Sequence, residues 1–344
     1  MKLLISFFAL LSQVAILAKP FKECLDSDGA KCQGGLVESG VYATIPKGSW
    51  QNAYDETMKL NVFLPGKPNN GQYPIVVFFT GFQSVQPSST YQDVLGEMAA
   101  KGEGSIVVAW DGLGHSNCLR PNASIHNFLP YFQYIEDGHL QTFINSKFTR
   151  PASYDIKKLV IAGHSAGNRL SILLSLLKPS VGLILLDPVD QGPFNISPSI
   201  FNSTPVAYAG PIMILTTELG TRKGTAMFPP CVNPGDGLKF YNAFQGNTKY
   251  RFDALYYGHG DFLSPDSLIS WGVGFTHMCP TVSDPKVHTF QGLRDFVSGT
   301  SAAFVSLYGR KHASFEKYLT DASLFNVGAN LTTDNVKDHH FWNF

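Results

Sequence analysis

This chain has no excess of charge of either sign, only five cysteines and, beyond its first residues, no long uncharged apolar run. Lysine plus arginine and aspartate plus glutamate number 26 each, so the net charge of the 344 residues is zero. A chain without a net field or a charged run has little to attract nucleic acid or an anionic membrane. No later stretch is long enough and free enough of charge, glycine and proline to cross a bilayer. We therefore expect no nucleic-acid partner and no integral membrane span, and instead a neutral or small ligand.

The few cysteines limit the cross-links and metal sites that the chain can form. In an oxidising compartment five cysteines predict two disulfides and one unpaired thiol. Cys24 and Cys32 are close enough in sequence to close a small loop, but the spacing does not identify the unpaired residue. No Cys/His cluster has the spacing of zinc ligands, so we expect no metal site. The cysteines are Cys24, Cys32, Cys118, Cys231 and Cys279.

The first residues, "MKLLISFFALLSQVAILAKP", place a lysine before an apolar run and end that run at the small residue Ala18. This is the pattern of a cleavable signal peptide, and the run is short for a membrane span. We predict a signal peptide over residues 1–18, cleaved near Ala18, and a secreted mature protein over residues 19–344 that forms one domain. Four N-glycosylation sequons agree with secretion. They begin at Asn122, Asn195, Asn202 and Asn330.

Short apolar runs alternate with helical patterns along most of the chain, as in "PIVVFFTG" and "SIVVAWDG". Such runs are typical of strands buried on both faces, and helices between them indicate parallel crossovers. We predict an α/β fold with a mostly parallel, doubly wound sheet. The expected strands lie at 74–81, 105–112, 157–165, 181–190, 211–220 and 250–260, and the expected helices at 91–102, 129–148 and 166–178.

The stretch "LVIAGHSAGNRL" contains Gly163-His164-Ser165-Ala166-Gly167, which matches Gly-x-Ser-x-Gly. The pattern alone is common, but here a buried strand precedes it and a helix follows. In that setting the tight turn holds the serine hydroxyl above the sheet, and the helix N-terminus points at it. We therefore predict that Ser165 is a nucleophile.

A serine nucleophile needs a base and an acid that orients the base, and in this topology they follow in the order serine, acid, histidine. His259, after "DALYYG", is the expected base, and His277 is the alternative. Three acids end predicted strands: Asp187, Asp190 and Glu218. Composition and position do not rank them.

The developing oxyanion needs two backbone donors. The amide of Ala166 is the first by geometry. The second is expected from the turn after "VVFFT", at Gly81-Phe82, with the amide of Phe82 as donor.

Four blocks, in order over residues 74–265, resemble the chlorophyllases. They are "PIVVFFTGF", "GHSAG", "LILLDPVD", and "FPPCVNPGDGLKFYNAF" followed by "YYGHGDFLSPDS". The resemblance implies an α/β-hydrolase fold with loop insertions over the active site, and an esterase that separates a long alcohol from a large ring acid. It assigns Ser165 as nucleophile, Asp187 as acid and His259 as base, and leaves Asp261 to fix the loop. The platelet-activating-factor acetylhydrolases, a looser resemblance, place the acid similarly.

The chain departs from the chlorophyllases beside the nucleophile. Ala166 and Asn168 stand where those enzymes usually carry arginine and a second glycine, and Thr80 stands where many hydrolases have histidine. Reactivity should survive, since the oxyanion donor is a backbone amide, but substrate choice can change.

We therefore expect a secreted serine carboxylic ester hydrolase that acts on a hydrophobic ester and requires no cofactor. The loops at 191–209 and 219–237 follow strand ends, where open α/β sheets place their ligand crevice. Apolar side chains there are expected to bind the alcohol: Phe194, Phe201, Met227 and Phe228. The alternatives are a lipid esterase of phospholipase or acetylhydrolase type, a peptidase with the same triad, and a hydrolase fold that binds without catalysis. The natural substrate and the oligomeric state stay open.

Overall fold

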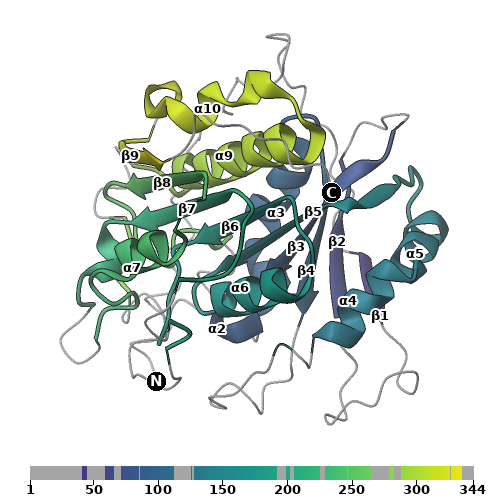
Figure 1. The fold of residues 1–344 in the computed structure, drawn as a ribbon, viewed down its shortest axis with the longest axis horizontal. Helices are drawn as coiled ribbons and strands as arrows, with labels where there is room; N and C mark the ends of the chain where they lie inside the picture. Colours follow the sequence, from purple (N-terminus) through teal and green to yellow (C-terminus); the bar gives the residue numbers. More distant parts are fainter. Residues whose placement is uncertain are drawn as a thin grey trace, which may run out of the picture.

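A sheet of nine strands forms the centre of the molecule over the residues that the computed structural model describes (Figure 1). Those residues are 41–44, 59–65, 71–84, 86–111, 125, 128–191, 199–201, 205–224, 229–245, 247–264, 279–282, 288–325 and 327–334. The strand order is β1-β2-β4-β3-β5-β6-β7-β8-β9. The strands are β1 (Val41–Thr44), β2 (Lys59–Phe63), β3 (Tyr73–Phe79), β4 (Ile106–Asp111), β5 (Tyr154–His164), β6 (Gly182–Leu186), β7 (Ile212–Thr217), β8 (Lys249–Ala254) and β9 (Ala329–Asp334).

The strands from β4 to β8 pair in parallel, while β1, β2 and β9 are antiparallel to their neighbours at the two edges. Parallel strands need crossover segments that cover the faces of the sheet, so both faces of the central strands are buried. All seven residues of β3 and all six of β7 are buried. This is why the central strands are continuous apolar runs in the sequence.

Helices cover the sheet on both faces (Figure 1). They are α2 (Gly81–Ser84), α3 (Gln92–Ala100), α4 (Leu129–Glu136), α5 (His139–Lys147), α6 (Gly167–Leu177), α7 (Asp236–Ala243), α9 (Phe290–Arg310) and α10 (Lys317–Thr320). Buried side chains of α4, α5, α6 and α7 share one core with the sheet, and those of α3, α9 and α10 share a second core on the other face.

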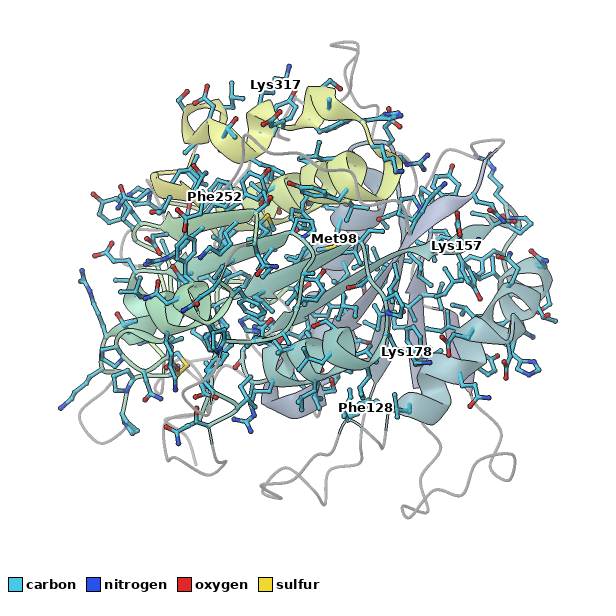
Figure 2. The ribbon with its side chains drawn as sticks, in the orientation of Figure 1. Met98, Phe128, Lys157, Lys178, Phe252 and Lys317 are labelled. Atoms are coloured by element: carbon cyan, nitrogen blue, oxygen red, sulfur yellow. A yellow bond between two sulfur atoms is a disulfide. The ribbon has the colours of Figure 1, made fainter. Side chains whose placement is uncertain are left out.

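Alternate residues of each central strand enter the two cores, as the two-residue period of a strand requires. In β3, Ile75 and Val77 belong to the first core, and Val76 and Phe78 to the second. Figure 2 shows Met98 and Phe252 of the second core in the upper half of the view and Phe128 of the first core in the lower half.

The predicted α/β fold and its mostly parallel sheet are confirmed, and the architecture is that of an α/β-hydrolase. One expectation was wrong in detail. The helix expected over 129–148 is two helices, because Gly138 adopts a left-handed φ of 78° between α4 and α5. The edge strands β1, β2 and β9 and the long helix α9 were not anticipated. Within the described residues no helix is long and apolar enough to span a membrane.

Candidate active site

Ser165, the predicted nucleophile, lies in a strand–turn–helix segment, as expected from the sequence. Strand β5 ends at His164 and α6 begins at Gly167, and Ser165 between them has a φ of 57° in the left-handed region. A Cβ on Gly163 would lie 2.5 Å from Ser171 Oγ, and one on Gly167 would lie 2.3 Å from the Thr80 carbonyl oxygen. The two glycines are therefore required by close packing, and the strained serine conformation is typical of a nucleophile elbow.

Three side chains from the carboxyl ends of different strands meet at this turn. The Ser165 Oγ lies 2.8 Å from His259 Nε2, and His259 Nδ1 lies 2.8 Å from Asp187 Oδ2. Asp187 directly follows β6, and His259 follows β8 in the chain. Since Asp187 accepts at Oδ2, Nδ1–H donates to the carboxylate and Nε2 is left to accept the serine proton.

Asp187 is held in place by the neighbouring strand. Its Oδ1 accepts from the Thr217 amide at 2.9 Å, and its Oδ2 accepts from the Thr217 hydroxyl at 2.6 Å. The carboxylate is fully buried, so these bonds replace the water that it loses. Sequence reasoning did not select Thr217, which is the last residue of β7.

The other two candidate acids, Glu218 and Asp190, bond to residues other than His259. Glu218 pairs with Arg222 and accepts from the Tyr256 amide at 2.9 Å.

Asp190 is buried and is bound by Arg169, Lys239, Ser199 and the Ile200 amide. Burial would raise the pKa of Asp190, but the hydrogen bonds from Lys239, Ser199 and Ile200 outweigh it and lower the pKa. Neither carboxylate hydrogen-bonds to His259 in the described structure, and His277 lies outside the described residues.

Asp261, two residues after the histidine, bridges backbone segments. Its Oδ2 accepts from the amide of Gly258 at 2.7 Å and from that of Val282 at 2.9 Å. Burial raises the pKa of Asp261 to about 7, because the two amide bonds only partly compensate for lost hydration. The contacts are those of a residue that holds the histidine loop.

A disulfide joins Cys231 to Cys279. Close to its two ends, Val232 donates its amide to the Gly220 carbonyl at 3.0 Å, and Val282 donates its amide to Asp261 Oδ2 at 2.9 Å. Sequence reasoning expected two disulfides; Cys24, Cys32 and Cys118 lie outside the described residues.

The turn predicted to supply the second oxyanion donor lies beside the turn that carries Ser165. Because a Cβ on Gly167 would strike the carbonyl of Thr80, the end of β3 touches the start of α6. The amide of Gly81 donates to the Tyr91 hydroxyl at 3.0 Å. Phe82 follows it in α2, and Ala166 is the residue directly before α6.

The expected substrate side chains are mostly outside the described residues, namely Phe194, Met227 and Phe228. Phe201 is described and packs edge-on against Phe240 of α7, with ring centroids 4.8 Å apart. Of the sequons, Asn330 lies exposed in β9, and Asn122, Asn195 and Asn202 are outside the described residues.

Two further residues at the site were not selected from the sequence. The His164 ring stacks on that of His259, with centroids 4.7 Å apart and planes inclined by 29°. The Tyr91 hydroxyl lies 2.7 Å from His164 Nδ1. His164 lies within the Gly-His-Ser motif, so the sequence could have identified it as a site residue. No sequence pattern could have identified Tyr91.

A family model for the chlorophyllases matches residues 40–330. Chlorophyllase-1 of Arabidopsis thaliana is 29% identical over 264 residues, covering 70% of this chain and 74% of that protein. Chlorophyllase type 0 of Chenopodium album is 23% identical over 327 residues, covering 90% of this chain and 88% of that protein. A thermostable esterase from Pseudomonas putida is similar in structure with a TM-score of 0.44 and 17% identity, over 65% of this chain and 73% of that one.

The sheet topology and the turn at Ser165 define an α/β-hydrolase. The family match extends over most of the chain, and the chain belongs to the chlorophyllase family. The predicted family resemblance is thus confirmed.

Proposed function

We propose that this protein is a serine carboxylic ester hydrolase that acts on the ester of a hydrophobic alcohol. The observation that carries the proposal is His259 placed 2.8 Å from both Ser165 Oγ and Asp187 Oδ2 at the carboxyl edge of the sheet. This arrangement lets one imidazole take a proton from the serine while the carboxylate stabilises the resulting charge.

In the acylation step Ser165 Oγ attacks the ester carbonyl carbon and its proton passes to His259 Nε2. Asp187 keeps the imidazole in the tautomer that can accept this proton. The imidazolium then gives the proton to the alkoxy oxygen as the ester C–O bond breaks, and the alcohol leaves. Water repeats the sequence on the acyl-serine and releases the acid.

The oxyanion of the tetrahedral intermediate requires donors aimed at it. The amide of Ala166 follows the nucleophile. The Gly81 amide already donates to Tyr91, so the next amide, that of Phe82, is the second donor in this proposal.

The substrate class is the finer part of the proposal. Relatives named chlorophyllase share 23–29% identity with this chain, which supports a substrate like chlorophyll, whose hydrolysis gives chlorophyllide and phytol. The apolar loops at 191–209 and 219–237 are the proposed alcohol site.

We also propose that the protein is secreted after cleavage near Ala18. The Cys231–Cys279 disulfide supports this, because disulfides persist in oxidising compartments. Expression of the full chain in a secreting cell, with mass determination of the product in the medium, should show a protein that starts near Lys19 and loses mass on glycosidase treatment. Retention in the cell with residues 1–18 intact would contradict it.

The proposed activity is tested by hydrolysis of short and long p-nitrophenyl esters and of chlorophyll a by the purified protein, with Ser165→Ala and His259→Ala in parallel. We expect wild-type hydrolysis and a loss of roughly 10⁴-fold or more in kcat/KM in both variants. Release of chlorophyllide identifies the substrate class, whereas a rate increase only on aggregated lipid esters identifies a lipid esterase. If wild type and Ser165→Ala were equally inactive on every ester, the esterase proposal would be wrong, and the result would favour a hydrolase fold that binds without catalysis.

A further inference from the structure

A second histidine, His164, packs against the proposed base His259. His164 is buried, its ring stacks on that of His259, and its Nε2 lies 3.2 Å from the His259 carbonyl oxygen. Burial, and then the charge of His259, hold the pKa of His164 well below its ordinary value. His164 is therefore a neutral imidazole with one N–H.

The partners of His164 identify the protonated nitrogen. A carbonyl oxygen only accepts, so the proton must be on Nε2, which donates to His259. Nδ1 then accepts, and its partner is the Tyr91 hydroxyl at 2.7 Å. The Tyr91 oxygen in turn accepts from the Gly81 amide at 3.0 Å. Every donor thus points in one direction, from Gly81 through Tyr91 and His164 to the carbonyl of His259.

Gln86 completes this assignment. The Tyr91 hydroxyl also lies 2.8 Å from Gln86 Oε1, but its single proton serves only one acceptor. Gln86 Nε2 is buried without a hydrogen-bond partner in the described part of the chain. Rotating the Gln86 amide by a half turn places Nε2 at the hydroxyl, where it donates to the tyrosine oxygen. Each of these contacts then has one donor and one acceptor.

We propose that Tyr91 and His164 are positioning residues, and that their hydrogen-bonded chain fixes the separation between the His259 loop and the oxyanion turn at Gly81-Phe82. This inference rests on the proposed function. Proton transfer and oxyanion binding act on the same tetrahedral intermediate, so both groups must keep their places to within a fraction of an ångström. The chain joins them directly through buried side chains. Because His164 is neutral, it does not oppose the positive charge that His259 gains.

The first variant is Tyr91→Phe, which removes the hydroxyl and leaves the ring. The matched control is Tyr250→Phe, which removes another buried hydroxyl, bonded to Tyr308 at 2.8 Å between β8 and α9. On p-nitrophenyl butyrate we expect kcat of Tyr91→Phe to fall roughly 10-fold to 100-fold with KM little changed. The control should keep the wild-type kcat, although its melting temperature also falls.

The second test is a pair of variants at His164. In His164→Gln the amide nitrogen can reach the position of Nε2 and keep the bond to the His259 carbonyl. In His164→Asn the amide reaches only the position of Nδ1 and keeps the contact with Tyr91. We expect the Gln variant to retain a higher kcat than the Asn variant at equal thermal stability, whereas a space-filling role predicts equal losses. If Tyr91→Phe does not fold, the comparison of the two His164 variants is sufficient to test the proposal.

Ser165→Ala in the same series separates the two proposals. If wild type is no more active than Ser165→Ala, the proposed function fails and the positioning role fails with it. If wild type is active but Tyr91→Phe matches Tyr250→Phe in kcat, or the Asn variant equals or exceeds the Gln variant, the positioning role is overturned and the esterase stands.

Discussion

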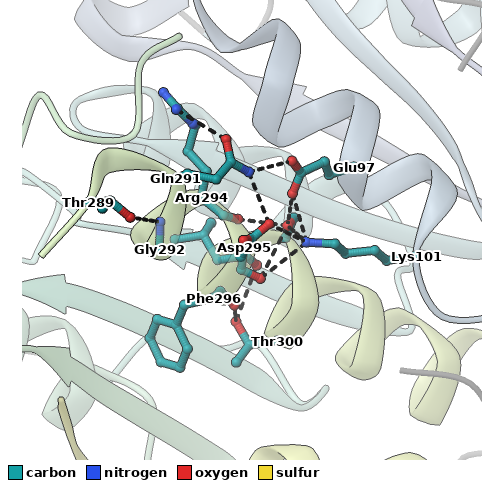
Figure 3. Close-up of polar contacts among 11 residues, drawn as sticks. Glu97, Lys101, Thr289, Gln291, Gly292, Arg294, Asp295, Phe296 and Thr300 are labelled. Atoms are coloured by element: carbon teal, nitrogen blue, oxygen red, sulfur yellow. Dashed lines mark hydrogen bonds and ion pairs between the residues drawn. The ribbon is translucent and has the colours of Figure 1, made fainter. Parts of the chain in front are cut away.

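Two polar networks in this protein, one at the sheet edge and one that is only half-buried between two helices, differ in how they are built. The one at the carboxyl edge of the sheet joins Ser165, His259, Asp187, His164 and Tyr91 through individual hydrogen bonds. The other lies between α3 and α9 on one face of the sheet, where Lys101 contacts Glu97 at 2.7 Å and Asp295 at 3.1 Å (Figure 3).

The networks also differ in what they demand of geometry. Attraction between charges falls slowly with distance, so the ion pair between Lys101, at the end of α3, and Asp295 of α9 holds the two helices together over a range of positions. A hydrogen bond weakens steeply when its length or angle changes, so the network at the sheet edge fixes single atoms. The helix network suits the joining of two neighbouring helices, and the network at the sheet edge suits proton transfer.

The loop that carries His259 contacts both helices of the second network, and Asp93 of α3 donates its amide to Ser264 Oγ at 3.1 Å. Arg294 of α9 donates to the carbonyl of Leu263 at 3.1 Å, and Leu263 lies on the loop that carries His259. Figure 3 shows Arg294 beside Gln291, which bonds to Glu97 and Asp295. The helix network therefore supports the loop without contacting the reacting atoms.

The largest expected effect is a loss of kcat/KM when Asp187 is replaced, compared with replacement of Glu218. Asp187→Asn should lower kcat/KM roughly 10⁴-fold, because an amide no longer accepts the Nδ1 proton and the wrong tautomer is favoured. Glu218→Gln is the matched control, since Glu218 bonds to Arg222 and not to His259. Ester hydrolysis by both variants measures the difference. A greater loss in Glu218→Gln would contradict the observed arrangement.

The helix network should affect stability and not chemistry. Lys101→Met leaves Glu97 and Asp295 beside each other without their cation, so the free energy of unfolding should fall by about 2 kcal/mol, while kcat/KM stays within about twofold. Urea unfolding and ester hydrolysis measure the two quantities. Lys157→Met, at an exposed position on β5, is the control and should change neither. A large loss of kcat in Lys101→Met would remove the distinction between the networks.

The smallest effect concerns the pH dependence of stability. Burial raises the pKa of Asp261 from 3.8 to about 7. The folded protein thus holds a proton that the unfolded chain releases, so this contribution to stability is complete below pH 3.8 and is lost as the pH rises through about 7. Asp261→Asn carries no such charge and should be more stable than wild type by about 1 kcal/mol at pH 8.

Unfolding at pH 5 and pH 8 tests this prediction. The advantage of Asp261→Asn should be smaller at pH 5, where wild-type Asp261 is protonated. Equal differences at both values of pH would show that the carboxyl does not titrate on folding.

The sequence predicted the central sheet better than its edges. Strands β3 to β8 are mostly buried on both faces, apart from the half-buried start of β5, so their apolar runs were plain in the sequence. The edge strands β2, with Lys59 and Asn61, and β9, with "ANLTTD", mix polar and apolar residues. They pair because the sheet presents open edges to them, which a local pattern does not encode. Likewise, only the observed φ of Gly138 separates α4 from α5.

At the site, local constraints and long-range packing contributed differently. Gly163, Ser165 and Gly167 are close in sequence, and their spacing predicts the tight turn by itself, because close packing forbids side chains there. The order serine, acid, histidine also follows from the succession of strands. The choice of Asp187 over Glu218 depends on which strand end faces His259, and Tyr91 reaches His164 across 73 residues of sequence. Periodicity and turn chemistry act over a few residues and so were determined by the sequence alone, whereas partners from separate strands meet only when the sheet has formed.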